Sequence, residues 1–310
     1  MNNIICIAGP TASGKTALAV ELAKELNGEV ISCDSMQIYK RMDIGTAKPT
    51  TEEMQGIPHH MINVAQPDED FSVSKYCEMA SAIIDDIVAR GKTAIVAGGT
   101  GLYMDSLIKG NNFAPFPATG HRERLEEKLS SVGLDAMLSE LAAVDPDAAL
   151  RSQRNPRRII RALEVYYETR ETITSHNLKT QAIPPRYNPL WLGLDFEPRA
   201  LLYERINQRV GLMLEMGLEQ EIRTLLSSGI SPKCTAMQAI GYKEFVAALD
   251  GQCTIEEAAD EVRKASRRYA KRQLTWFRRN EKMHWLTRRA HEGSDEIIAR
   301  ARQIICNFDN

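Results

Sequence analysis

Long apolar runs are missing from this 310-residue sequence. No stretch approaches the roughly 18 to 20 consecutive apolar residues that a transmembrane helix needs. The first ten residues also lack the charged segment and the cleavage site that a secretory signal peptide carries. We therefore expect a soluble, cytoplasmic protein without a membrane partner.

Paired cysteines are missing as well. The six cysteines, none of them in a C-x-x-C pair, are Cys6, Cys33, Cys77, Cys234, Cys253 and Cys306. This scatter supports neither a disulfide framework nor a zinc knuckle, and it suits a reduced cytosol. His59-His60 lacks the i, i+4 spacing of a helical metal pair, and nothing after Trp285 has the spacing of a zinc finger. No zinc site is expected.

Excess charge of one sign is also absent from the whole chain, although not from its parts. The formal net charge is −2, with 43% apolar and 26% charged residues, which suits one large domain or two modest ones. Yet residues 261–290 carry eleven Lys or Arg against Glu261 and Glu281, and residues 151–170 carry six Arg against two Glu. Segregated basic charge favours a polyanionic partner, and the alternative is a pair of solvated helix faces.

Short apolar runs alternate with helical patterns in the first hundred residues. Residues 3–8, 29–33 and 93–97 are continuous apolar strands of the kind buried on both faces of a parallel sheet. Residues 16–26 and 71–90 have helical spacing. The alternation predicts an α/β fold with a parallel sheet flanked by helices.

The pattern changes after Tyr103. Breakers rich in proline lie at residues 111–119 and 182–189, and the segment between them is helix-like without a convincing strand. A further strand is expected at 190–194, followed by long helices at 201–227 and 254–279. These features predict a core formed by residues 1–112 and 190–310, with an inserted all-helical domain at 113–189.

A phosphate-binding motif follows the first strand and opens the first helix. The sequence G-x-x-x-x-G-K-[ST] is formed by Gly9, Pro10, Thr11, Ala12, Ser13, Gly14, Lys15 and Thr16. Backbone amides of such a loop surround phosphate oxygens, Lys15 adds a positive charge, and Thr16 can ligate Mg²⁺. We expect a diphosphate or triphosphate here, most such loops holding ATP or GTP, and the alternative is a purely structural turn.

The remaining strand ends add candidate chemistry. The N-K-x-D motif of GTPases is absent, whereas Asp34 directly follows the second apolar run. Asp34 can be a magnesium ligand, a general base or a buried capping residue. Thr100 follows the third run within a glycine-rich turn, 98–101. Because ligands bind at the carboxyl ends of parallel strands, both side chains should face the phosphate loop.

Taken together, the motifs resemble one family along essentially the full length of the chain. The matching blocks are GPTASGKT at 9–16, DSMQIYKRMDIGTAKP at 34–49, GIPHHMINVAQPDEDFSV at 56–73, GGTGLY at 98–103, RNPRRIIRALEVY at 154–166, INQRV at 206–210, AMQAIGYKE at 236–244 and RRYAKRQLTWFRRN at 267–280. They resemble the bacterial tRNA dimethylallyltransferases, also called tRNA isopentenyltransferases. The resemblance implies a P-loop NTPase-like core with a helical insertion.

The same resemblance implies a reaction and its catalytic residues. A dimethylallyl group would pass from dimethylallyl diphosphate to N6 of adenosine 37, in tRNAs that read codons beginning with U. Lys15, Mg²⁺ and loop amides would neutralise the leaving diphosphate. Asp34 matches the family's general base, Thr100 the threonine that positions the amine, and Arg209 an arginine associated with the diphosphate.

The acceptor side implies contacts with the tRNA anticodon stem-loop, whose unpaired bases can be drawn into a pocket. The family positions that contact tRNA match Asp34, Ser35, Met36, Gln37, Arg157, Arg158, Ile159, Ile160, Arg161, Gln238, Ala239, Ile240, Gly241, Tyr242 and Lys243. The basic segment 263–279 is expected to add phosphate contacts, while Trp276 and Phe277 are expected to pack in the core. We expect a monomer.

Three other functions fit parts of the pattern. A P-loop kinase acting on a small metabolite or nucleoside could use Asp34 as base or magnesium ligand. An adenylate isopentenyltransferase would use a free nucleotide as acceptor, although the arginine-rich insertion favours a macromolecule. A non-catalytic RNA-binding protein with a regulatory nucleotide site has no chemical need for Lys15, Thr16 and Asp34 together.

Overall fold

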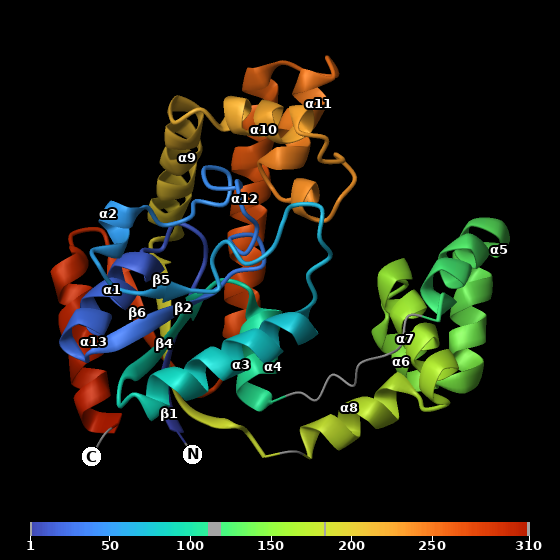
Figure 1. Cartoon of the computed structure of the whole chain (residues 1–310), viewed down its shortest axis with the longest axis horizontal. Helices are drawn as coiled ribbons and strands as arrows, with labels where there is room; N and C mark the ends of the chain where they lie inside the picture. The colour runs from blue at the N-terminus through green and yellow to red at the C-terminus, as the bar shows by residue number, and fades with distance from the viewer. Residues whose placement is uncertain (1, 111–118, 183, 309–310) are drawn as a thin grey trace. The chain divides into compact units, whose positions relative to one another are not determined.

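The computed structural model describes residues 2–110, 119–182 and 184–308, and its chain forms two compact units (Figure 1). The larger unit comprises Met1–Ile108 and Arg186–Asn310, and the smaller unit comprises Lys109–Pro185. None of the described helices is long and apolar enough to cross a membrane.

A parallel sheet forms the centre of the larger unit. Its strands are β1 (Asn2–Ala8), β2 (Gly28–Cys33), β3 (His59–His60), β4 (Thr93–Gly98), β5 (Tyr187–Glu197) and β6 (Met283–Arg289). They lie in the order β3-β2-β4-β1-β5-β6, and every strand pair is parallel. The predicted fold class is confirmed.

The register aligns the carboxyl ends of the central strands. Ala8 at the end of β1 pairs with Gly98 of β4 and with Gly193 of β5, and Cys33 at the end of β2 also pairs with Gly98. The segments that follow β1, β2 and β4 therefore leave the sheet at the same edge. Ligands of open parallel sheets bind at this edge.

Helices cover both faces of the sheet. The helices of the larger unit are α1 (Lys15–Glu25), α2 (Thr51–Met54), α3 (Val73–Ala89), α4 (Gly101–Lys109), α9 (Arg199–Glu215), α10 (Leu218–Ser227), the 3₁₀ turn η1 (Ala236–Gln238), α11 (Tyr242–Leu249), α12 (Ile255–Phe277) and α13 (Ser294–Phe308). Alternate β1 residues serve the two faces: Ile5 and Ile7 pack with α1 and α13, and Ile4 and Cys6 pack with α3 and α4 (Figure 1). This alternation follows from the two-residue period of a strand.

Two details depart from the sequence-based expectations. The helix expected at 201–227 is broken into α9 and α10, because Gly217 adopts φ 94°, a conformation that side chains with a Cβ rarely take. Strand β6 was not expected, because its sequence, MHWLTRR, lies within residues 261–290, where Lys and Arg are in excess, and because its residues alternate irregularly between buried and exposed.

The smaller unit is built from helices in its described part. They are α5 (His121–Val144), α6 (Pro146–Arg151), α7 (Pro156–Thr169) and α8 (Ile173–Gln181). Its own apolar core includes Leu125, Met137, Leu141 and Leu163. The breaker expected at 111–119 lies outside the described residues, except for Thr119.

Candidate active site

The turn between β1 and α1 has the backbone of a phosphate-binding loop. Ala12 adopts φ 61° and Gly14 φ 92°, so the chain passes twice through left-handed conformations before α1 begins at Lys15. The first amides of a helix have no partner within the helix, and such a loop can present them to an anion. The geometry suits a phosphate group.

Lys15 is half-buried and folds back over this loop. Its Nζ donates a hydrogen bond of 2.6 Å to the carbonyl of Pro10. Burial and, to a smaller extent, the Arg209 cation lower the pKa of Lys15 to about 8, although the Asp34 carboxylate acts in the opposite direction. A bound anion would stabilise the charged ammonium group and offset the cost of its burial.

Ser13 supplies an independent sign that the loop accommodates a ligand. Its side chain is buried, and its Oγ has no hydrogen-bond partner among the described residues. A Cβ on Gly9 would lie 3.0 Å from this oxygen, so the loop is already closely packed. Buried hydroxyl groups without a partner are rare, and a phosphate oxygen or its bound water would satisfy this one.

The donor set also fits Mg²⁺. The Thr16 hydroxyl lies in the first turn of α1, and the Asp34 carboxylate follows β2. No cluster of three or more His, Cys, Asp or Glu side chains suited to a metal exists in the described parts of the chain. Magnesium bound with a diphosphate takes most of its oxygens from phosphate and water, so one or two protein ligands suffice.

Asp34 both caps a turn and retains an available oxygen. Its Oδ1 accepts hydrogen bonds from the backbone amides of Met36, at 2.8 Å, and Gln37, at 3.4 Å. Within residues 2–110, 119–182 and 184–308, nothing donates a hydrogen bond to Oδ2. The capping role therefore orients the carboxylate and leaves one oxygen for a ligand or a proton.

Thr100 lies beside Asp34 across two strand ends. Its Oγ1 accepts the amide of Ser35 at 3.0 Å, and its own amide donates to the carbonyl of Cys33 at 3.2 Å. Tyr269 of α12 joins them: burial and the Asp34 charge raise the pKa of its phenol to about 12, while a hydrogen bond with Thr100 opposes the shift. The structure brings Asp34 and Thr100 together.

A buried glutamine connects the phosphate loop to the glycine-rich turn. Gln273 of α12 accepts the amide of Thr11 at Oε1, at 3.0 Å, and donates from Nε2 to the carbonyl of Gly99, at 2.9 Å. A Cβ on Gly99 would lie 2.1 Å from that Nε2, so only glycine allows this approach. Gln273 thereby fixes the spacing between the phosphate loop and Thr100.

Two arginines of α9 contact the site. Arg209 donates to the carbonyl of Ala47 at 3.3 Å, and burial lowers its pKa while Glu53 and Asp34 act against that shift. Arg205 donates to the carbonyl of Ala12 in the phosphate loop at 3.0 Å. Both place positive charge near the loop, as binding of a diphosphate requires.

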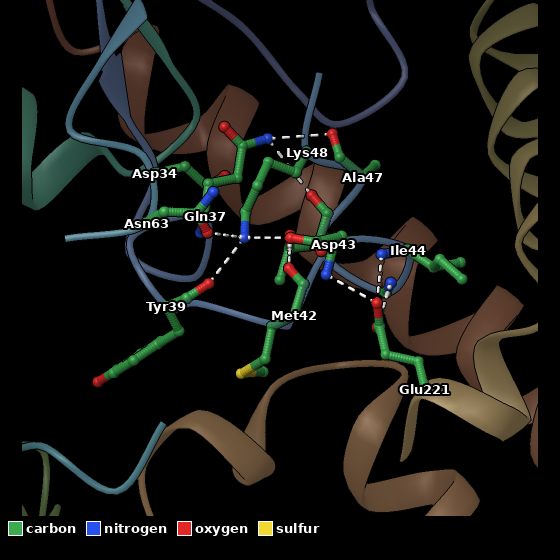
Figure 2. A network of polar contacts seen from close by, with 12 residues as sticks. Asp34, Gln37, Tyr39, Met42, Asp43, Ile44, Ala47, Lys48, Asn63 and Glu221 are labelled. Atoms are coloured by element: carbon green, nitrogen blue, oxygen red, sulfur yellow. Dashed lines mark hydrogen bonds and ion pairs between the residues drawn. The ribbon is translucent and has the colours of Figure 1, made fainter. Parts of the chain in front are cut away.

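The segment after Asp34, residues 34–48, is held by a polar network, and we call it the acceptor loop (Figure 2). Lys48 donates three hydrogen bonds, to the Tyr39 carbonyl at 2.7 Å, to Asp43 at 2.6 Å and to Asn63 at 2.7 Å. The side chain of Lys48 is only 5% exposed, and its burial lowers its pKa. All three protons of the ammonium have acceptors.

Among the expected tRNA contacts, the acceptor loop and the 238–243 block present few accessible groups. Gln37 already uses its amide, accepting from Ser32 at 2.9 Å and donating to Ala47 at 3.1 Å. The side chains of Gln238 and Lys243 are exposed, Ile240 is half-buried, and Ala239, Gly241 and Tyr242 are buried. The assignments of Ser35 and Met36, both half-buried, stay predictions.

In the smaller unit, the matching segment divides in two. Arg157 and Arg158 are exposed at the start of α7, whereas Ile159 and Ile160 belong to the core of that unit. Arg161 forms an ion pair with Glu164 at 2.7 Å. The two isoleucines support the helix that carries the arginines.

Trp276 and Phe277 of α12 pack in the core, as expected. Trp276 donates from Nε1 to Asp105 at 3.0 Å, and Phe277 is 2% exposed. The exposed residues of the same helix include Lys264, Arg268, Lys271 and Arg272. The solvent-exposed surface of this helix is therefore cationic from Lys264 to Arg272.

Several residues of the site had no role in the sequence-based prediction. They are Lys48, Arg205, Glu221 and Gln273. Lys48 and Gln273 lie inside blocks that matched the family, so those matches marked them without indicating what they do. Tyr269 was singled out only as one of the aromatic residues that recur beside basic residues, a pattern that suits nucleic acid. Arg205 and Glu221 gave no signal, because their contacts depend on how α9 and α10 return to the sheet edge.

Comparisons with known proteins agree with this geometry. The family model described as IPP transferase matches residues 37–280. A tRNA dimethylallyltransferase of Acetivibrio thermocellus is 44% identical over 310 residues, covering 99% of this chain and 99% of that protein. A tRNA dimethylallyltransferase of Caldanaerobacter subterraneus subsp. tengcongensis is 49% identical over 286 residues, 91% of this chain and 90% of that protein.

Solved structures give the same result. The full-length tRNA isopentenylpyrophosphate transferase from Bacillus halodurans aligns with a TM-score of 0.75 and 42% identity, over 100% of this chain and 97% of that one. A eukaryotic dimethylallyltransferase acting on tRNA aligns with a TM-score of 0.82 and 31% identity, over 99% and 80%. Because the family match spans most of the chain and these relatives align along nearly all of it, the chain belongs to the IPP transferase family, prenyltransferases known as tRNA dimethylallyltransferases.

Proposed function

We propose that this protein transfers a dimethylallyl group from dimethylallyl diphosphate to N6 of adenosine 37, in tRNAs reading codons that begin with U. The products are N6-isopentenyladenosine and diphosphate. The observation that carries the proposal is a phosphate loop joined through Gln273 to an aspartate and a threonine at the same sheet edge. The similarity to relatives described as tRNA dimethylallyltransferases supports it.

The donor side neutralises the leaving group. Diphosphate occupies the loop Gly9–Thr16, where backbone amides, the Ser13 hydroxyl and Lys15 meet its oxygens. Arg209 adds a forked cation. As the C–O bond breaks, negative charge grows on the diphosphate, and donors already in place stabilise it without reorganisation. When bound, Mg²⁺ held by the Thr16 hydroxyl would supply further charge neutralisation.

The acceptor side removes a proton from the attacking amine. Asp34 Oδ2 accepts the N6 proton while Oδ1 keeps its bonds to the turn, so the carboxylate does not rotate away. Thr100, held by Ser35, positions the amine. The base at position 37 must leave its stack to reach this oxygen, which an unpaired anticodon loop allows.

The tRNA contacts of this proposal divide by chemistry. Asp34–Gln37 meet the base, and the block Gln238–Lys243 packs against Gly45 of the same loop through Tyr242. Arg157–Arg161 belong to the helical unit, whose exposed arginines suit backbone phosphates. The catalytic core, expected at 1–112 and 190–310, corresponds to the larger unit, which also includes the start of β5 at Tyr187, and the tRNA-contacting insertion, expected at 113–189, corresponds to the smaller unit. The enzyme acts as a monomer in the cytoplasm, where its tRNA substrate is found.

A pair of incubations tests the function. Purified protein, Mg²⁺ and unmodified tRNA are combined with radiolabelled dimethylallyl diphosphate in one tube and with γ-labelled ATP in the other. Label in the tRNA at adenosine 37 is the expected result. Phosphate released from ATP without allyl transfer would replace this proposal with a kinase. In a further tube with AMP in place of tRNA, label taken up by AMP while tRNA takes up none would indicate a nucleotide acceptor.

A further inference from the structure

Tyr242, one of the residues expected to contact tRNA, is fully buried in the larger unit. Its side chain is 0% exposed, and its hydroxyl donates to Glu221 Oε1 at 2.6 Å. A Cβ on Gly45 would lie 2.5 Å from the Tyr242 ring, so the ring packs directly against the acceptor loop. Burial, with the Glu221 charge, raises the pKa of Tyr242 and keeps the phenol a hydrogen-bond donor.

Glu221 gathers three consecutive backbone amides of the acceptor loop (Figure 2). Its Oε2 accepts from Asp43 and Ile44, both at 2.8 Å, and its Oε1 accepts from Gly45 at 3.2 Å. Hydrogen bonds to a charged acceptor are stronger than neutral ones, and three adjacent bonds leave this backbone one conformation. Helix α10 thus holds the middle of the loop.

The network continues from Glu221 to both substrate sides. Asp43, whose amide is held by Glu221, accepts the Lys48 ammonium at its carboxylate. Ala47 directly precedes Lys48. Its carbonyl accepts hydrogen bonds from the side-chain amide of Gln37, at 3.1 Å, and from the guanidinium of Arg209, at 3.3 Å. A shift at residues 43–45 would therefore move the Ala47 carbonyl. This carbonyl is the shared partner of Gln37, on the acceptor side, and Arg209, on the diphosphate side.

We propose that Glu221 is a positioning residue for the acceptor base and that Tyr242 acts through Glu221 rather than by touching tRNA. The pair holds the acceptor loop in the conformation that presents Asp34 to the attacking amine. This inference rests on the proposed function. It assigns the conformation of the loop to α10 and α11, neither of which has to touch the reacting atoms.

Three substitutions and two matched controls test it. Tyr242→Phe removes only the hydroxyl, Glu221→Gln keeps an oxygen acceptor, and Glu221→Ala removes the carboxylate. Tyr187→Phe is the tyrosine control. Tyr187 lies at the start of β5, and its hydroxyl donates to Asp85 of α3 rather than to a residue of the acceptor loop. Glu219→Ala is the glutamate control, because this residue pairs with Arg223 on the surface of the same helix.

Each protein is assayed for kcat, for equilibrium binding of tRNA and of dimethylallyl diphosphate, and for thermal unfolding. Displacing a catalytic group by about 1 Å can cost roughly a hundredfold, so we expect kcat to fall about 10²-fold in Glu221→Ala. We expect kcat to fall about tenfold in Glu221→Gln and about fivefold in Tyr242→Phe, because each variant loses only part of the hydrogen-bond network that holds the acceptor loop. The dissociation constant for tRNA and the salt dependence of its binding should change less than about twofold, since the contacts with tRNA phosphates are intact. The dissociation constant for dimethylallyl diphosphate reports how far Arg209 shifts with the Ala47 carbonyl. The controls should match the wild type in kcat and in both dissociation constants.

Unchanged kcat in folded Tyr242→Phe and Glu221→Gln would overturn the inference. Weaker tRNA binding with kcat retained would also overturn it, by making Tyr242 a tRNA contact. If Glu221→Ala does not fold, the two conservative variants decide. A wild-type protein that transfers no label would refute the proposed function itself, whereas a loss confined to the variants concerns only this positioning role.

Discussion

Replacing Gly99 by alanine is expected to be harmful only while Gln273 is present. The new Cβ would lie 2.1 Å from Gln273 Nε2 and 3.3 Å from its Cδ. An approach this close forces the glutamine to move. Its hydrogen bonds to the Thr11 amide and the Gly99 carbonyl would break, although the backbone groups stay where they are.

The size of the effect follows from these contacts. Overpacking costs about 1–3 kcal/mol, and each of the two lost hydrogen bonds costs about 0.5–1.5 kcal/mol, so Gly99→Ala should lose roughly 2–6 kcal/mol of unfolding free energy. Gln273→Ala breaks the same two bonds without a clash and should lose about 1–3 kcal/mol. The double variant has no glutamine and keeps only a close contact of 3.3 Å between the new Cβ and the Gly9 carbonyl, so we expect it to resemble Gln273→Ala alone, within about 1 kcal/mol.

Urea unfolding of the wild type, the two single variants and the double variant measures this coupling. Gly211→Ala provides the control, because nothing lies within 4 Å of its Cβ and its backbone is helical. Its effect should add to that of Gln273→Ala. If the Gly99 and Gln273 effects also add to within about 0.5 kcal/mol, the two residues are not coupled and the reasoning about the glutamine bridge is refuted.

The remaining predictions concern catalysis and binding. Asp34→Ala should lower kcat by about 10² to 10⁴ with little change in tRNA binding, and near-normal turnover would remove Asp34 from the mechanism. Replacing Arg157 and Arg158 by alanine should weaken tRNA binding and reduce its salt slope, measured by titration at several salt concentrations; an unchanged slope would make them solvated residues. Because the pKa of Lys15 is about 8, below its ordinary 10.5, its ammonium loses its charge above pH 8. Affinity for dimethylallyl diphosphate should therefore fall more than about tenfold from pH 7.5 to 9.5 in calorimetric titrations, and Lys15→Met should show no such fall.

The sheet was predictable where short apolar runs are bounded by small residues. Strands β1, β2 and β4 lie close to the predicted ranges, because strands covered on both faces need apolar residues at every position. Strand β6 lies at the edge of the sheet and tolerates charged residues, so its sequence carries no such signal. The break at Gly217 was visible only as one glycine within a helical pattern.

The site was predictable where chemistry is local in sequence. The phosphate loop needs eight consecutive residues, and Asp34 follows its strand directly. Gln273 meets Thr11 across 262 positions of sequence, and Glu221 meets Asp43 across 178. Contacts of that kind are fixed by the topology, and neither periodicity nor spacing reports them. The family resemblance placed Tyr242 near tRNA, whereas its burial indicates a different role.

The place of β1 in the sheet determines when the fold can be completed during synthesis. β1 lies between β4 and β5, and its register with β5 runs from Asn2 to Ala8. One edge of β1 therefore stays open until the ribosome has released Tyr187–Glu197. At roughly 5–20 residues per second, this exposure lasts on the order of ten to forty seconds. The intervening helices can form their own core during this time. The nascent chain therefore completes its inserted unit before β1, the strand that precedes the phosphate loop, is paired along both edges.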